Sequence, residues 1–200
     1  VEGIVVGDFR NNGESDNGDL YGFYVQDPEG DGDPATSDGI FVYDGSSPAV
    51  DVNVGDAVRV RGTVDEYNEL TEITSVSLVL TCGTGSVEAT PVDLPIPDDL
   101  EPYEGMLVTF PEELTASQNY FQGRYGQVTM SSEGRMFQPT NIYRPDTNEA
   151  LTLAADNWRR MFVLDDGTTA QNPDPIPYIG LDNTLRAGDT VVGLTGLVDY

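Results

Sequence analysis

Residues 55–64 read GDAVRVRGTV, and this stretch decides the fold class of the chain. Apolar and polar residues alternate along it, which is the pattern of a β-strand with one buried face. Gly62 lies inside the stretch, and a glycine within a strand is typical of a bulge or a tight bend. The stretch therefore predicts a bent strand of the kind found in small β-barrels.

Four further segments of the first 90 residues have strand character, namely residues 3–9, 20–26, 39–43 and 71–80. Clusters of Gly, Asn, Asp and Pro separate them, as expected for turns and loops. Five closely spaced strands predict an OB-like β-barrel module over residues 1–90. Residues 91–102 are rich in proline and predict an extended linker.

The pattern of the first module returns after the linker. Three pairs of segments share a pattern and occur in the same order: residues 2–6 with 104–108, 41–45 with 162–167, and 55–58 with 188–191. Such an order predicts an internal repeat of one structural plan. The expected fold is therefore mainly β, with two tandem OB-like β-barrel modules, the second over residues 103–200. The closing strand of the second barrel is expected beyond Tyr200.

The second module is longer than the first, and part of its extra length predicts an inserted helix near residues 147–160. Asp146 and Glu149 have the spacing of a capping box. Apolar residues then recur at helical spacing, at Leu151, Ala154, Ala155, Trp158 and Phe162. We expect Trp158 to be the buried residue that holds this helix against the module.

Composition excludes several classes of active site. The chain has 35 Asp and Glu against nine Lys and Arg, for a net charge of −26, and it has no histidine and one cysteine. These counts exclude a Ser-His-Asp triad, a Cys-His pair, imidazole zinc ligands and a cysteine cluster. A chain this acidic repels nucleic acid overall, so any contact with DNA must be local or bridged by a metal ion.

Several features indicate a secreted piece of a longer polypeptide. No apolar run is long enough to span a bilayer, which predicts no membrane insertion. All nine basic residues are arginines, and an acidic surface without lysine fits a protein in salty water. The chain starts at Val1 in a strand-like run, as an excised piece would. Cys82 is expected to be a small buried hydrophobe, the alternative being a disulfide to a cysteine outside the chain.

An acidic loop between the second and third expected strands has the spacing of a calcium loop. Counted from Asp27 as position one, Gly32 falls at position six and Asp38 at position twelve. The candidate ligands of Ca²⁺ are the five carboxylates of this loop: Asp27, Glu29, Asp31, Asp33 and Asp38. The flanking strands exclude a helix-loop-helix EF-hand. The alternative interpretation is a solvated acidic hairpin loop.

The region over residues 117–162 differs in charge from the rest of the chain. It holds five arginines and four acids, whereas residues 1–116 hold three arginines and 25 acids. Aromatic residues are interleaved with these arginines, which suits contact with nucleic acid, a domain interface or simple support of the fold. The candidate residues for the first two roles are Arg124, Tyr125, Arg135, Tyr143, Arg144, Arg159 and Arg160.

Residues 22–43 and 54–64 resemble the OB-fold region of bacterial extracellular nucleases, and so do four segments of the second module. These four segments are residues 103–110, 123–126, 137–141 and 164–175. The resemblance therefore covers nearly the whole chain. It implies a C-terminal catalytic domain of the endonuclease/exonuclease/phosphatase (DNase I-like) superfamily, which uses His, Asp, Asn and Glu around a divalent metal ion. No catalytic residue of that domain matches a position here.

These expectations combine into one functional hypothesis and one alternative. The hypothesis is a non-catalytic accessory region of a secreted nuclease, which positions the catalytic domain of the same polypeptide and assists DNA binding. The alternative is a calcium-stabilised cell-surface or adhesion module that binds protein or glycan. The parent protein would be a hydrolase, but the 200 residues contain no catalytic set of their own, so enzyme activity of the chain is left open.

Overall fold

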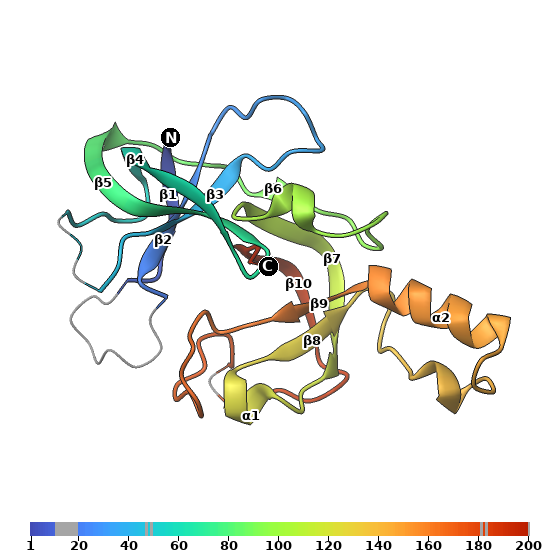
Figure 1. The fold of residues 1–200 in the computed structure, drawn as a ribbon. Helices are drawn as coiled ribbons and strands as arrows, with labels where there is room; N and C mark the ends of the chain where they lie inside the picture. The colour runs from blue at the N-terminus through green and yellow to red at the C-terminus, as the bar shows by residue number, and fades with distance from the viewer. Residues whose placement is uncertain (11–19, 47, 49, 181, 183, 200) are drawn as a thin grey trace. The chain divides into compact units, whose positions relative to one another are not determined.

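The computed structural model describes residues 1–10, 20–46, 48, 50–180, 182 and 184–199 (Figure 1). The chain forms two compact units, and each unit is discontinuous in sequence. The first unit comprises Val1–Pro91, Leu100–Thr109 and Thr195–Tyr200. The second comprises Val92–Asp99 and Phe110–Leu194. None of the helices in the described ranges is long and apolar enough to cross a membrane.

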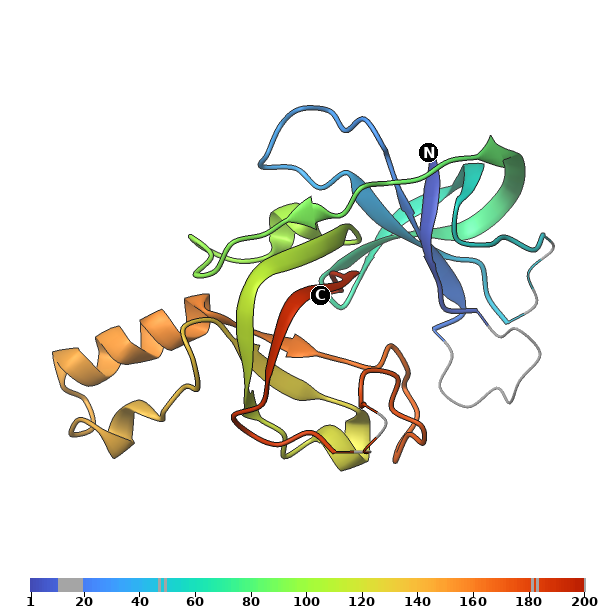
Figure 2. The same cartoon turned by 180° about the vertical axis from the view of Figure 1, so that it is seen from behind.

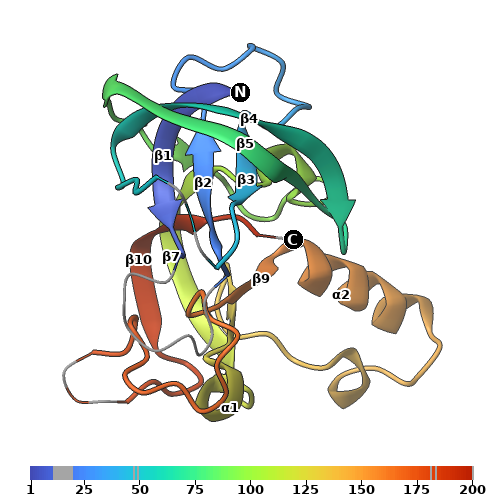
Figure 3. The same cartoon turned by 60° about the vertical axis from the view of Figure 1, so that its left-hand side comes forward.

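The first unit contains a closed five-stranded β-barrel, which confirms a β-barrel as part of the fold (Figure 3). Its strands are β1 (Glu2–Asp8), β2 (Gly22–Gln26), β3 (Gly39–Tyr43), β4 (Asp56–Tyr67) and β5 (Leu70–Thr84). The strand order is β1-β2-β3-β5-β4, and pairing of β1 with β4 closes the barrel. The β3–β5 pair is parallel, and the other pairs are antiparallel.

The barrel interior is packed mainly with valine and other β-branched or aromatic residues. Its core cluster comprises Val5, Phe23, Val25, Val42, Val52, Val58, Val60 and Ile73. Gly62 lies at a shift in the β4–β5 register. A Cβ there would lie 2.4 Å from Cγ2 of Ile73 and 2.5 Å from the carbonyl oxygen of Thr74. Glycine is therefore required where β4 bends close to β5.

The segments Leu100–Thr109 and Thr195–Tyr200 join the first unit through polar contacts with the barrel. The Gln26 side chain accepts a hydrogen bond from the Leu107 backbone N–H at 2.8 Å. The Tyr24 hydroxyl donates to Asp199 Oδ1 at 2.9 Å. The first unit also contains the short strand β6 (Thr90–Pro91), which pairs in parallel with Val108 and Thr109, and the 3₁₀ helix η1 (Glu101–Tyr103).

The second unit is built on a sheet whose strand order is β10-β7-β8-β9. The bounds of these strands are Thr190–Leu197, Leu107–Gln118, Val128–Ser131 and Met161–Leu164, and β7 and β10 contribute residues to both units. The strands of this sheet can be matched in sequence order with the first four strands of the barrel, so that β7 corresponds to β1 and β10 to β4. With this match, the order β10-β7-β8-β9 is the same as β4-β1-β2-β3 in the barrel. The described residues include no counterpart of β5 in this sheet, so the second barrel stays a prediction.

The helices of the second unit are α1 (Gln122–Tyr125), the 3₁₀ helix η2 (Pro139–Asn141) and α2 (Asn148–Arg159), the longest of the three (Figure 2). The N-cap of α2 is Thr147, whose side chain accepts from the Ala150 N–H at 3.3 Å. The expected capping by Asp146 is wrong, because Asp146 has a φ of 60° and precedes the cap.

Two expectations about burial are also wrong. Within α2 only Ala150 is buried, and the Trp158 side chain is 66% exposed instead of buried. The apolar spacing of α2 therefore does not mark a core face. Cys82 is exposed as well, because it lies in the far half of β5, where the residues after Ser75 are exposed or only partly buried.

Candidate functional sites

The acidic loop, residues 27–38, connects β2 and β3 as a hairpin. At its base the Asp27 N–H donates to the Asp38 carbonyl at 2.9 Å. Gly30 and Gly32 have φ values of 63° and 79°, in the left-handed region that favours glycine. A Cβ on Gly30 would lie 2.6 Å from Oδ2 of Asp38. Glycine therefore leaves room for the Asp38 carboxylate beside residue 30.

The carboxylates of the acidic loop accept hydrogen bonds from the loop itself. Asp38 accepts from the Asp31 N–H at 3.0 Å, and Asp31 accepts from the Asp33 N–H at 2.8 Å and from the Thr36 hydroxyl at 3.0 Å. Asp33 accepts from the N–H of Ala35 and Asp27 from that of Glu29. Oxygen ligands suit Ca²⁺, but within the described ranges no three acidic, His or Cys side chains are grouped to hold a metal ion. The calcium site stays a prediction.

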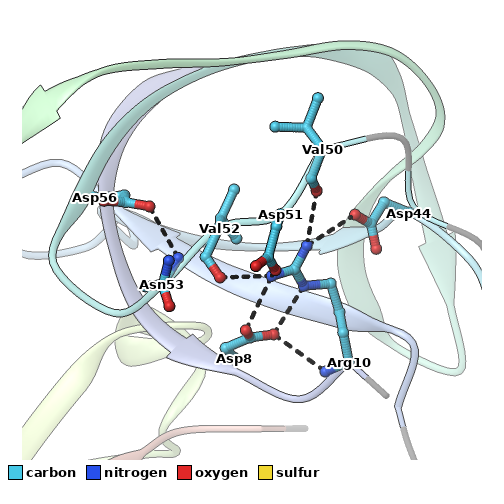
Figure 4. A network of polar contacts seen from close by, with 8 residues as sticks. All are labelled: Asp8, Arg10, Asp44, Val50, Asp51, Val52, Asn53 and Asp56. Atoms are coloured by element: carbon cyan, nitrogen blue, oxygen red, sulfur yellow. Dashed lines mark hydrogen bonds and ion pairs between the residues drawn. The ribbon is translucent and has the colours of Figure 1, made fainter. Parts of the chain in front are cut away.

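A second acidic cluster surrounds Arg10, directly after β1 (Figure 4). The guanidinium binds Asp8 in a bidentate fashion, with Nε–Oδ1 at 2.8 Å and Nη2–Oδ2 at 2.9 Å. It lies 3.7 Å from Asp44 Oδ2 and 3.3 Å from Asp51 Oδ1. It also donates to the backbone carbonyls of Val50 and Val52, at 3.0 and 2.6 Å. We call Arg10 with Asp8, Asp44 and Asp51 the Arg10 cluster.

Two members of the Arg10 cluster, Arg10 and Asp44, are buried, whereas Asp51 is exposed. The Arg10 side chain is 2% exposed and that of Asp44 is 5% exposed. Burial raises the pKa of Asp44 to about 6, while the attraction of Arg10 partly opposes this rise. The hydrogen bond to Asp8 is the largest of several effects that raise the pKa of Arg10. Through its contacts with Asp8, Val50 and Val52, Arg10 connects residues 50–52 to the end of β1.

The Arg10 cluster was not predicted from the sequence. One signal was present, because Arg10 is the only basic residue among the first 58 and lies two residues after Asp8. A lone cation in so acidic a stretch is a candidate for a buried partner of carboxylates. Its partners Asp44 and Asp51 are distant in sequence and could not be identified from spacing.

The structure does not bring the candidate arginines of residues 117–162 together as one site. Arg159 pairs with Asp156 at 3.0 Å, and Arg160 pairs with Glu133 at 3.3 Å, so both are engaged within the second unit. Arg124 lies over the Tyr125 ring, 5.8 Å from its centroid. Three members of the set are exposed: Arg135, Tyr143 and Arg144. Neither Arg135 nor Arg144 has an ion-pair partner among the described residues.

A groove of about 530 Å³ lies in the second unit, and Arg135 is the one candidate residue that lines it. Its walls come from β7, β8, the segment 135–141 and α2. The aromatic lining residues are Phe137 and Trp158, and the side-chain amides are Gln118, Gln138, Asn141 and Asn157. Arg135 is the only charged residue among the described residues that line the groove. The groove can therefore offer ring faces and neutral hydrogen-bonding groups to a ligand.

Hydrogen bonds fix the segment that carries Arg135 and Phe137. The Met136 N–H donates to the buried Ser117 hydroxyl at 2.8 Å, and the Asn157 side chain donates to the Phe137 carbonyl at 2.9 Å. On the N-terminal side, the Ser131 hydroxyl donates to the Gly134 carbonyl at 3.0 Å. The groove wall is thus held by contacts to β7, β8 and α2.

Comparison with known proteins gives no assignment: no family model, no curated protein and no solved structure matches the chain.

Proposed function

We propose that the chain is a non-catalytic accessory region of a secreted nuclease, which positions a catalytic domain of the same polypeptide and assists its binding to DNA. The observation that carries the proposal is the strand order of the first unit. A closed barrel in the order β1-β2-β3-β5-β4, with one parallel pair, supports an OB-like fold. The segments that resemble extracellular nucleases, residues 22–43 and 54–64, provide β2, β3 and most of β4 of this barrel.

The strand order of the second unit supports a repeat of the same plan. The order β10-β7-β8-β9 matches β4-β1-β2-β3 when the strands are compared in sequence order. On this comparison α2 lies between the counterparts of β2 and β3, as an insertion into a second OB-like module. Two such modules in tandem suit a supporting region, since the barrels present rigid surfaces and the loops vary.

The distribution of charge favours support over broad capture of DNA. The β2–β3 connection is the acidic loop, and the β4–β5 turn at Asn68 and Glu69 is flanked by Glu66 and Glu72. Carboxylates at these loops repel phosphate. Contact with DNA is therefore assigned to exposed arginines of the second unit, Arg124, Arg135 and Arg144. A calcium ion on the acidic loop would add a local positive charge that can bridge to phosphate.

The non-catalytic assignment is tested by incubating the purified chain with plasmid DNA in buffers that contain Mg²⁺ and Ca²⁺. We expect the plasmid to stay intact on an agarose gel, because no catalytic residue of the nuclease domain that the resemblance implies matches a position in this chain, and the chain has no histidine. Cleavage that follows the protein through successive chromatographic steps would overturn the assignment.

The contribution to DNA binding is tested separately, by gel retardation of a short duplex at low salt. The triple variant Arg124→Ala, Arg135→Ala, Arg144→Ala should retain the duplex less than the unmodified chain does, because it removes three exposed cations. Arg59→Ala, in the first unit, shows how much retention falls when one exposed arginine outside this region is lost. Equal retention by the triple variant would refute the DNA-binding part of the proposal.

A further inference from the structure

The groove of the second unit carries two exposed aromatic rings from two different elements. Trp158 is near the end of α2, and Phe137 lies in the segment 135–141; their exposed fractions are 66% and 57%. Because burial of apolar surface is favourable, a ligand that covers both rings would gain binding free energy. They suit a ligand with a flat face of C–H groups, which can lie against a ring without losing its own polar contacts.

The polar groups of the groove match hydroxyl groups. Gln118 accepts from the Thr129 hydroxyl through Oε1, at 3.2 Å, which leaves its amide N–H groups to donate. Asn157 donates to the Phe137 carbonyl, which leaves its amide oxygen to accept. A hydroxyl group donates and accepts at once, so neighbouring amide donors and acceptors pair with it well.

The charge of the groove argues against a polyanionic ligand. Among the described residues that line it, Arg135 is the only one with a charge, while the whole chain carries −26. Binding of nucleic acid requires several cations along the phosphate backbone, because counterion release provides much of the affinity. A neutral ligand has no repulsion to overcome, and Arg135 can donate hydrogen bonds to its oxygens.

The groove is preorganised on the side that carries Phe137. The backbone of residues 134–137 receives hydrogen bonds from Ser131 and Asn157 and donates one to Ser117. Arg160 adds a further hydrogen bond to the Gly134 carbonyl, at 3.3 Å. A wall held in this way loses little conformational entropy when a ligand binds.

We propose that this groove binds a neutral β-linked glucan, with sugar rings packed on Trp158 and Phe137. A β-linked glucopyranose carries its substituents equatorially, so both faces of the ring present C–H groups. Its hydroxyl groups lie at the edge of the ring and can pair with amide groups such as those of Gln118 and Asn157, which line the same groove. This activity goes beyond the proposed accessory role in a nuclease and does not depend on it. It would equally suit an adhesion module.

Trp158 is the only tryptophan of the chain, so tryptophan fluorescence reports on this groove alone. Cellohexaose and laminarihexaose are titrated into the intact chain. We expect at least one of them to shift the emission to shorter wavelength with saturation, at a Kd of about 1 mM or tighter. Phe137→Ala should weaken that binding by about tenfold, because one of the two ring faces is lost. Tyr120→Ala removes an aromatic side chain that is 80% exposed and outside the groove, and it should leave the Kd unchanged.

Trp158→Ala is measured by calorimetry, since it has no fluorescence signal, and should abolish the heat of binding. Circular dichroism checks that each variant is folded; both rings are exposed, so neither substitution removes core packing. The proposal is overturned if neither hexasaccharide changes the emission or gives heat at about 10 mM. It is also overturned if the Phe137 and Tyr120 variants bind equally well, or if only an oligothymidylate shifts the emission.

Discussion

The Arg10 cluster and the acidic loop contain the same residue type, several aspartates close together, but they are stabilised in different ways. In the Arg10 cluster a guanidinium binds Asp8 and lies beside Asp44 and Asp51. In the acidic loop backbone N–H groups and a threonine hydroxyl provide the donors. Burial explains the difference, because water screens exposed carboxylates, whereas a buried carboxylate needs a charged or hydrogen-bonded partner.

This comparison shows that local acid density does not by itself indicate a metal site. The buried acids are neutralised by a cation of the chain itself, and the exposed acids satisfy their hydrogen bonds within the loop. A metal ion in the acidic loop would therefore have to compete with bonds that the loop already makes. Three experiments test this difference, and the largest effect is expected at the buried cation.

Arg10→Met should lower the free energy of unfolding by about 3–5 kcal/mol, because it leaves Asp8 and Asp44 with uncompensated charge in a poorly solvated site. Urea denaturation followed by circular dichroism gives the value. Arg59→Met is the control, since the Arg59–Glu2 pair is exposed on both sides and its loss should cost less than about 1 kcal/mol. Equal effects of the two substitutions would show that burial does not distinguish the two regions.

Asp44→Asn tests the titration of the Asp44 carboxyl. The pKa of Asp44 is raised to about 6 in the folded chain, so protonated Asp44 favours the folded state. This stability is present below the unfolded pKa of about 3.8 and is lost as the pH rises through about 6. The free energy of unfolding of the unmodified chain should therefore fall with rising pH in a way that the Asp44→Asn variant does not share. Between pH 4 and pH 8 the variant should gain about 2 kcal/mol of unfolding free energy relative to the unmodified chain.

The control for Asp44→Asn is Asp51→Asn, which alters another carboxylate beside Arg10 whose side chain is 86% exposed. Unfolding curves at a series of pH values give both profiles. If the difference between Asp44→Asn and the unmodified chain is flat with pH, the carboxyl of Asp44 is not desolvated as the structure indicates.

The strands of the first unit were predictable because runs rich in β-branched and aromatic residues are bounded by clusters of Gly, Asn, Asp and Pro. Alternation alone would not have identified them all, since every residue of β2 is buried. Residues 39–43 were expected as a strand and form β3, and the bend expected at Gly62 lies at the register shift in β4. The expected fifth strand, residues 71–80, is too short, since β5 runs over Leu70–Thr84. The end of β5 is determined by its pairing with the long strand β4, and this pairing cannot be predicted from the local hydrophobicity of β5.

Features that depend on distant partners could not be predicted. Arg10 contacts Asp44, Val50 and Val52, which lie some forty residues away in sequence. Trp158 has the spacing of a core residue but is exposed, because periodicity identifies a face and not what covers it. The groove likewise needs β7, β8 and α2 in place, although the composition of residues 117–162 did single out Arg135 as a candidate.

The calcium prediction for the acidic loop is the remaining test, and its expected effect is the smallest. If the loop binds Ca²⁺ with a Kd of about 1 mM, a free Ca²⁺ concentration of about ten times the Kd should raise the free energy of unfolding of the first unit by about 1 kcal/mol and raise its Tm. The double variant Asp31→Asn, Asp38→Asn keeps oxygens that accept the N–H groups of Asp33 and Asp31, but removes two charges. It should fold and lose the response to Ca²⁺. If Ca²⁺ shifts the Tm of the double variant equally, or if isothermal titration of the unmodified chain gives no heat at millimolar Ca²⁺, the loop is a solvated hairpin whose carboxylates are satisfied by its own backbone.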